Sequence, residues 1–149
     1  MFDLVIADHV LFYCEDIPQV LAECRRVLKN GGRFLCSTYG KQHMREITDL
    51  VQQFHKEIVL SAEVLYERFG LENGENLLAP YFSEIQMRRY EDAIEIAEAE
   101  PLISYILSCH GNQNQLLLNQ YKEFREFVSA RVADGFHITK EAGIFLCRK

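Results

Sequence analysis

Two histidines, His9 and His43, are the side chains best suited to acid–base chemistry. His9 follows Asp8 at the end of one apolar run, and His43 follows Tyr39 shortly after a second one. Imidazole titrates near neutrality, so either histidine could act as a general base. Tyr39 and His43 are also placed to meet a substrate. The plainer alternatives are that Asp8 caps a turn, that His9 is a satisfied loop residue and that Tyr39 packs beneath neighbouring helices.

A basic pair, Arg88 and Arg89, could bind a substrate carboxylate or phosphate. The pair lies in the segment SEIQMRRY, which alternates polar with apolar or long side chains as a half-exposed strand does. On such a strand one arginine faces solvent and the other pairs with an acid such as Glu91 or Asp92. We therefore favour a structural role for this pair, away from the reacting centre.

The cysteines do not indicate a metal site or a disulfide framework. They are five in number, widely scattered and never arranged as C-x-x-C, which is typical of reduced thiols in a cytosolic protein. Cys109 and His110 are adjacent, and adjacent residues on a helix point in different directions, so no metal is expected there. The cysteines are Cys14, Cys24, Cys36, Cys109 and Cys147.

Composition narrows the class of protein. The chain has 149 residues, 48% of them hydrophobic and 26% charged, which is near the average for a soluble globular domain. Its formal net charge of -6 disfavours binding to a nucleic-acid backbone. No apolar run approaches the ~20 residues of a membrane span, and the first residues lack the basic region of a signal peptide. We therefore expect a cytoplasmic protein without a membrane or nucleic-acid partner.

The first forty residues predict a strand, a helix, a glycine turn and a second strand. FDLVIADHVLF, residues 2–12, reads as a strand buried on both faces. Asp16 and Gln19 have N-cap and N3 spacing, and Pro18 suits the first turn of a helix. Asn30-Gly31-Gly32 then predicts the helix end, and residues 33–38 the next strand. The apolar helical stripe comprises Ile17, Val20, Leu21, Cys24, Val27 and Leu28.

Helices dominate the prediction for the middle of the chain. An apolar face runs from Met44 to Ile58, and Ser61 is expected to cap a further helix that ends at Phe69. After a strand over residues 83–90, Pro101 introduces another helix. A longer amphipathic helix is expected over residues 117–132, with Gly135 at its end. Residues 136–148 read as a β-hairpin whose turn is KEAG.

The segments FDLVIADHVLFYCED, LAECRRVLKNGGRF and STYG together resemble the fourth strand, the following helix and the fifth strand of a class I S-adenosylmethionine-dependent methyltransferase. Asp3 matches the acidic residue that opens the fourth strand, and Asp8 matches the polar residue at its tip. Residues 26–34 match the pattern R-x-L-K-x-G-G-x-F that follows the helix. Later segments, including GKQHM, FGLENGE and ITKEAGIFLCRK, are similar to small-molecule methyltransferases of the same kind.

This resemblance implies an α/β fold that holds the C-terminal half of a Rossmann-like sheet. The expected strand order is 4-5-7-6, with the last strand antiparallel and with lid helices. Residues 1–149 would be one truncated domain, with a βαβ core at 1–40, a helical lid insertion at 41–82, and C-terminal strands and helices at 83–149. The methyl acceptor would be a small molecule that the sequence does not identify.

The resemblance also implies the cofactor and its site. S-adenosylmethionine would lie against Ala7, Asp8, His9 and Leu11, with His9 and His43 as the catalytic histidines and Tyr39 and His43 on the substrate. The family's glycine-rich loop after the first strand is absent from these residues, and Asn30-Gly31-Gly32 cannot replace it because it follows a helix. We therefore expect weak or no cofactor binding by this chain alone, and an inactive isolated fragment.

The missing strands would leave the strand at residues 2–10 as an open edge. An apolar edge offers free backbone N–H and C=O groups to a similar strand, so we expect a homodimer through residues 4–10. Two alternatives remain open. The chain could be a non-enzymatic interaction module that self-associates through residues 2–10, or a subunit whose N-terminal half comes from another polypeptide.

Overall fold

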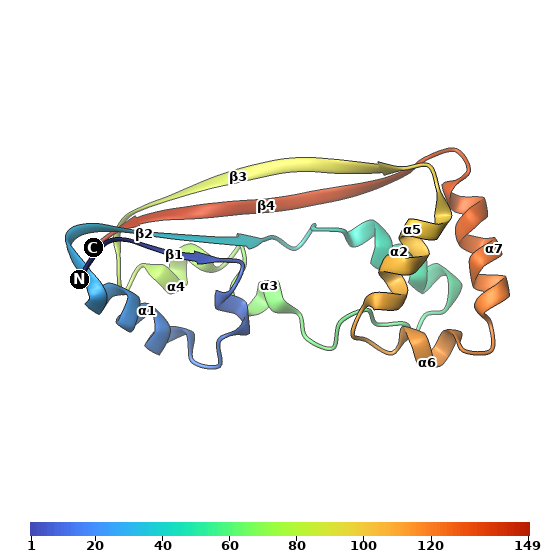
Figure 1. The fold of residues 1–149 in the computed structure, drawn as a ribbon, viewed down its shortest axis with the longest axis horizontal. Coiled ribbons are helices and arrows are strands. Elements are labelled where there is room, and N and C mark those ends of the chain that lie inside the picture. The colour runs from blue at the N-terminus through green and yellow to red at the C-terminus, as the bar shows by residue number, and fades with distance from the viewer. The chain divides into compact units, whose positions relative to one another are not determined.

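The apolar runs of the sequence form the four strands of one mixed sheet. The strands are β1 (Phe2–Asp8), β2 (Leu28–Tyr39), β3 (Ser83–Ile96) and β4 (Phe136–Arg148). The computed structural model describes residues 1–149 throughout and places the strands in the order β1-β2-β4-β3. β1 is parallel to β2, whereas β4 is antiparallel to it. This arrangement confirms the expected α/β half-sheet with an antiparallel last strand (Figure 1).

Eight short helical segments connect and flank the strands. None combines the length and apolar character that a bilayer span needs. The segments are the 3-10 turn η1 (Leu11–Tyr13), α1 (Ile17–Val27), α2 (Arg45–Phe54), α3 (Leu65–Arg68), α4 (Gly74–Leu78), α5 (Ala99–Ser108), α6 (Gln113–Leu117) and α7 (Tyr121–Val132).

The chain divides into two compact units. Unit 1 comprises residues 1–43, 64–91 and 141–149, and unit 2 comprises residues 44–63 and 92–140. The segment 41–82, expected as one helical lid, is thus shared between the units.

One face of the sheet in unit 1 carries its core. Because side chains alternate along a strand, Phe34 and Cys36 of β2 point to the same face, and their register partners on β4 are Cys147 and Phe145. All four are buried, together with apolar side chains of α1 and α4. Phe34 also stacks on Phe82, with 4.8 Å between the ring centroids. Figure 1 shows α1, α3 and α4 on this face.

The opposite face of the sheet has no helix layer. Phe2, Leu4 and Ile6 of β1 point to it and are 59%, 49% and 58% exposed. The expectation of a strand buried on both faces was therefore wrong, because no helix of unit 1 covers this side. The strand is also shorter than expected, since the chain turns into η1 after Asp8.

The N-cap predicted for α1 is confirmed, whereas the helix ends earlier than predicted. Asp16 accepts a hydrogen bond from the Gln19 amide at 2.9 Å. The helix stops at Val27, and Leu28 already has an extended backbone. Residues 30–32 therefore lie within β2 and do not cap the helix. Gly31 has a φ of 77°, and the register of β1 against β2 shifts beside this segment, which indicates a bulge.

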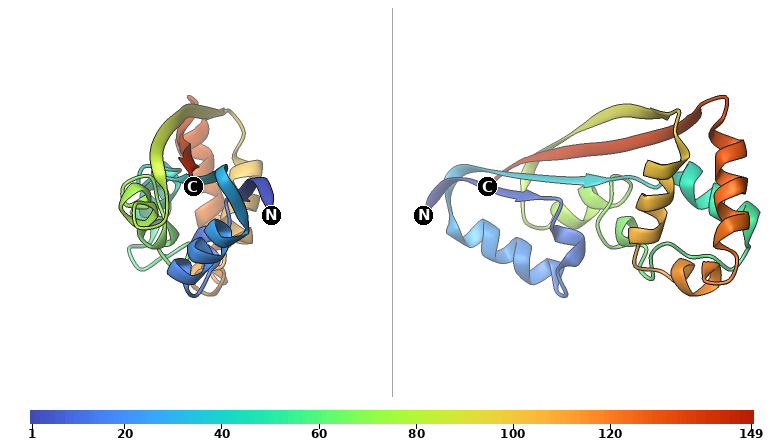
Figure 2. Two further views of the ribbon diagram at one scale, coloured as in Figure 1. Left: turned by 90° about the vertical axis from the view of Figure 1, so that its left-hand side faces the viewer. Right: turned by 45° about the vertical axis from the view of Figure 1, so that its right-hand side comes forward.

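Unit 2 has its own core, formed largely by α2, α5 and α7. Its buried centre includes Ile103, Ile106, Phe124 and Val128. Figure 2 shows α5 and α7 side by side. The helix expected over residues 117–132 is interrupted by a turn at 118–120, which separates α6 from α7. Gly135, with a φ of 92°, follows α7 as expected.

Three further predictions differ from the structure. Residues 136–148 form one strand, not a hairpin, because Ala142 and Gly143 pair with Tyr39 and Thr38 of β2 and so stay extended. Ser61 does not cap a helix, because its hydroxyl donates to the Glu63 carbonyl, and α3 has only four residues. β3 continues to Ile96, beyond the expected end at residue 90.

Candidate functional site

The predicted site residues lie at the carboxyl ends of two parallel strands. β1 ends at Asp8, and the register pairs Ala7 with Cys36 and Asp8 with Ser37. Parallel strands end at the same edge of a sheet, so the residues after β1 and those at the end of β2 come together. In open α/β sheets, ligands bind at this edge.

Ser37 links Asp8 to His9 and was not identified from the sequence. The Ser37 hydroxyl is almost completely buried and donates a hydrogen bond to Asp8 Oδ1. It accepts one from the His9 backbone N–H at 2.9 Å, and His9 Nδ1 lies 3.1 Å from the same oxygen. His9 has a φ of 48°, an uncommon conformation for a residue other than glycine, which turns its ring back toward β2.

The hydrogen-bond network assigns the tautomer of neutral His9. A serine hydroxyl has one proton and two acceptor lone pairs. The Ser37 proton goes to Asp8, so the contact with His9 requires Nδ1 to carry a hydrogen and donate it. Nε2 is then the basic nitrogen of His9.

His43 has the opposite assignment. Its Nδ1 accepts a hydrogen bond from the Glu141 backbone N–H at 3.2 Å, so its neutral ring carries the proton on Nε2. His43 therefore presents a donor where His9 presents an acceptor.

The rings of the predicted residues form one aromatic group. Tyr39 lies at its centre, with centroid distances of 5.2 Å to Phe12, 5.1 Å to His43 and 6.3 Å to His9. Tyr39 is half-buried against the core of unit 1. The structure thus brings His9, Tyr39 and His43 together, as a shared site requires.

Two other predicted cofactor residues are buried. Ala7 is 8% exposed, and Leu11 is completely enclosed in the core of unit 1. They form the apolar support behind Asp8 and His9, and they present little surface of their own.

Glu141 holds the loop that carries His43. Its carboxylate accepts a hydrogen bond from the Gln42 backbone N–H at 2.9 Å and forms an ion pair with Arg89. Its carbonyl accepts from the Gly40 N–H at 3.2 Å. This role was not predicted from the sequence, because KEAG reads as a turn. The expected pairing of an arginine with Glu91 or Asp92 was wrong, because the acid that Arg89 meets lies on β4, the strand beside β3.

An open hollow of about 380 Å³ lies beside Asp8, His9 and Ser37. Residues 88–90 of β3 and 142–144 of β4 complete its lining. Arg88 and Arg89 therefore lie close to the predicted site, although the sequence analysis placed them away from the reacting centre. The described residues contain no cluster of three or more histidine, cysteine or acidic side chains that could hold a metal.

Residues 1–36 match the family model described as "Methyltransferase domain". Over the whole chain, the fold is similar to a protein of Bacillus halodurans assigned as a methyltransferase, with a TM-score of 0.54 and 12% identity. The chain has the class I methyltransferase fold. The YcgJ protein of Bacillus subtilis also has a TM-score of 0.54, with 14% identity. Each alignment covers 99% of this chain and 64% of the solved one.

A curated relative supports the same assignment at the level of sequence. The malonyl-[acyl-carrier protein] O-methyltransferase of Hamiltonella defensa is 28% identical over 85 residues. These residues make up 57% of this chain and 31% of the relative, so the chain corresponds to only part of that enzyme. The resemblance to the methyltransferases is thereby confirmed.

Proposed function

We propose that unit 1 forms the Asp8–His9 side of an S-adenosylmethionine-dependent methyltransferase site that acts on a small molecule. The supporting observation is the Asp8–Ser37–His9 network, because it lies at the ligand-binding edge of the sheet and next to an open hollow. Asp8 and His9 also lie in the part of the chain that matches the methyltransferase domain.

The residues at this edge suit the charge of the cofactor. The methionine part of S-adenosylmethionine carries an ammonium group, for which the Asp8 carboxylate is a matched acceptor. Ala7 and Leu11 would support that part of the site from behind. When bound, the cofactor supplies an electrophilic methyl group, and the residues around it gain most of the rate by holding the acceptor in line with that group.

We assign different roles to the two histidines. His9 Nε2 would take the proton of an acceptor that is protonated at neutral pH, and the Nε2–H of His43 would donate to the acceptor beside Tyr39. A carboxylate acceptor is already ionised and would need no base. In a complete enzyme, replacement of His9 should therefore lower kcat strongly only for protonated acceptors.

Cofactor binding by residues 1–149 alone should be weak. They contain no glycine-rich loop between a strand and a helix, so the loop expected to contact much of the cofactor is not among them. We expect a Kd on the order of 1 mM, about 4 kcal/mol of binding free energy.

Titration with S-adenosylmethionine, followed by amide NMR, tests this assignment. The signals of Asp8, His9 and Ser37 should shift together, and Asp8→Asn should reduce the shifts while His110→Ala, an exposed histidine of unit 2, leaves them unchanged. Shifts confined to other residues would refute the site. Binding in the micromolar range would show that the expected weakness is wrong.

Self-association through β1 is a second part of the proposal. β1 pairs only with β2 and ends the sheet, so one backbone edge is available along residues 4–8. A two-fold axis at this edge would join two sheets into one. Light scattering should show a dimer that Ile6→Lys reduces to a monomer, whereas Tyr90→Lys on β3 should not. A monomer at millimolar concentration would contradict the proposal.

A further inference from the structure

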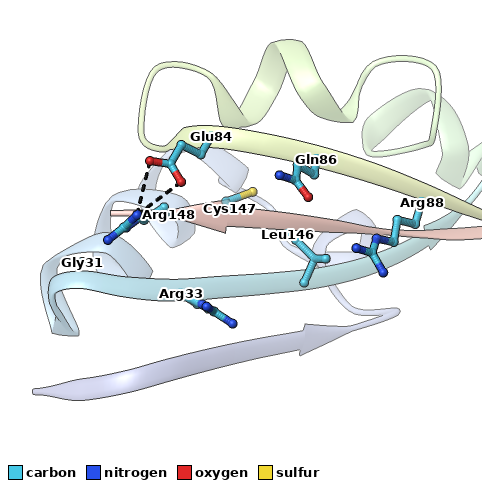
Figure 3. Close-up of a pocket in the computed structure, with 8 residues that line it drawn as sticks. All are labelled: Gly31, Arg33, Glu84, Gln86, Arg88, Leu146, Cys147 and Arg148. Atoms are coloured by element: carbon cyan, nitrogen blue, oxygen red, sulfur yellow. Dashed lines mark hydrogen bonds and ion pairs between the residues drawn. The ribbon is translucent and has the colours of Figure 1, made fainter.

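A second hollow, of about 320 Å³, lies on the sheet face that has no helix layer. It is distinct from the hollow at Asp8 and His9, although Arg88 borders both. Figure 3 shows that β2, β3 and β4 each contribute side chains to it, with Arg33 and Arg88 on either side of Leu146.

Three guanidinium groups line this groove. Arg33 on β2 and Arg148 on β4 are register partners, which places them side by side, and Arg88 comes from β3. The only acid in the lining is Glu84. Three positive charges against one negative charge leave two net positive charges, in a chain whose overall charge is -6.

These arginines lack the close partners that others in the chain have. Arg26 and Arg125 form ion pairs at 2.8 and 2.5 Å, with Glu23 and Glu100. Neither Arg33 nor Arg88 makes an ion pair or a side-chain hydrogen bond. Arg148 reaches Glu84 only at 3.4 Å, between two exposed side chains, which is a weak interaction.

The chemistry of the lining favours a doubly charged anion. A phosphate monoester carries a charge of about -2 near neutral pH and offers three acceptor oxygens. Guanidinium groups match such oxygens in pairs, and the Gln86 amide adds a further donor. A carboxylate carries one charge and would leave the second net positive charge unmatched.

The apolar part of the lining indicates that the anion is attached to an organic group. Leu146 lies between the arginines, and its side chain is half-buried. A volume of about 320 Å³ is at the lower end of small-molecule sites, which is enough for a phosphate and a small organic group. We propose that this groove binds a small organic phosphate, with the phosphoryl group on the neighbouring Arg33 and Arg148, the organic group on Leu146, and Arg88 adding positive charge on the far side of Leu146.

Titration with phenyl phosphate, followed by the arginine Nε–H signals, tests the proposal on the whole chain. The signals of Arg33 and Arg148 should shift saturably, and inorganic phosphate should bind more weakly because it cannot contact Leu146. Benzoate should bind about tenfold more weakly than phenyl phosphate, and phenol not at all. Equal affinity for benzoate, or shifts that do not saturate, would overturn the assignment.

Substitutions that avoid Arg88 separate this groove from the site at His9. Arg33→Gln and Arg148→Gln should each weaken phenyl phosphate binding about tenfold, whereas Arg125→Gln, which removes the same charge from unit 2, should leave it unchanged. If all three variants weakened binding equally, the net charge of the chain would explain the binding, and the proposal would be overturned. None of the three residues contacts Asp8, His9 or Ser37, so S-adenosylmethionine titrations of these variants report on the other site independently.

Glu84→Gln provides a test in the opposite direction. The substitution removes the only negative charge of the groove and releases Arg148, so phenyl phosphate should bind about threefold more tightly. Weaker or unchanged binding would contradict the arrangement of charges that carries the proposal.

Discussion

Ser37 Oγ donates a hydrogen bond to Asp8 Oδ1 across the parallel strands β1 and β2. The same oxygen is 3.1 Å from His9 Nδ1. One buried hydroxyl therefore connects the carboxylate and the imidazole at the edge where the ligand is proposed to bind, and it determines which nitrogen of His9 is the acceptor.

Ser37→Ala should change the tautomer of His9. Without the hydroxyl, nothing at that position accepts from Nδ1, so the population with Nδ1–H should fall. Long-range 15N–1H correlation spectra measure this population directly in the unliganded chain. Ser37→Thr keeps a hydroxyl and should retain the original tautomer. An unchanged His9 spectrum in Ser37→Ala would refute the role given to Ser37.

Glu141→Ala should loosen the loop that carries His43. The variant loses the acceptor of the Gln42 N–H and the ion pair with Arg89. Amide hydrogen exchange at Gln42 should accelerate roughly tenfold, since hydrogen bonds to charged groups are worth about 1.5 kcal/mol or more. Glu141→Gln keeps an acceptor and should have a smaller effect. Glu91→Ala, the acid that the sequence favoured as an arginine partner, should have none.

The buried thiols should make stability fall at alkaline pH. Burial raises the pKa of Cys147 to about 12, and it raises that of Cys36 even further. The unfolded thiols ionise near pH 9, so between pH 9 and 12 the unfolded state binds fewer protons than the folded state. The free energy of unfolding should therefore drop by up to about 1.4 kcal/mol per pH unit for each thiol.

Urea unfolding at several pH values between 9 and 10.5 measures the slope of the free energy of unfolding against pH. Cys147→Ala should make it shallower, whereas Cys14→Ala, which replaces a half-exposed thiol, should leave it closer to that of the parent chain. The packing lost in Cys147→Ala lowers the free energy of unfolding by the same amount at every pH. It therefore does not change the slope against pH. A slope identical to the parent in Cys147→Ala would contradict the burial effect.

Gly111→Ala should destabilise unit 2 far more than Gly135→Ala. A Cβ at Gly111 would lie 1.6 Å from the Val59 carbonyl oxygen, so the backbone would have to move. Overpacking of this kind costs about 3 kcal/mol or more. A Cβ at Gly135 meets nothing within 4 Å, and only the positive φ opposes it, at about 1–2 kcal/mol. Urea unfolding midpoints compare the two, and equal losses would contradict the steric argument.

Local signals in the sequence were sufficient where a few neighbouring residues determine the structure. Asp16 and Gln19 predicted the start of α1 because an N-cap needs only residues three positions apart. Asp8 and His9 were found because a polar pair ends an apolar run, and the resemblance to methyltransferases supplied the strand order. Their closeness to Tyr39 and His43 followed from the parallel pairing of β1 with β2.

Contacts between distant residues could not be predicted in the same way. KEAG has the residues of a turn, but Ala142 and Gly143 find partners on β2 and remain extended. Glu141 meets Arg89 across 52 residues, and this partner was not visible beside the nearer acids Glu91 and Asp92. Ser37 was read as part of an apolar strand, because nothing in its neighbourhood shows that Asp8 would lie opposite.

The position of β4 in the sheet affects how the chain folds during synthesis. β4 is the last strand to leave the ribosome, yet it lies between β2 and β3 in the finished sheet. Until it emerges, β2 has an unoccupied edge and β3 has no neighbouring strand, so β1 and β2 are the only strands that can pair. Closure of the sheet must therefore wait until residues 136–148 have been synthesised, and exposed strand edges persist during that interval.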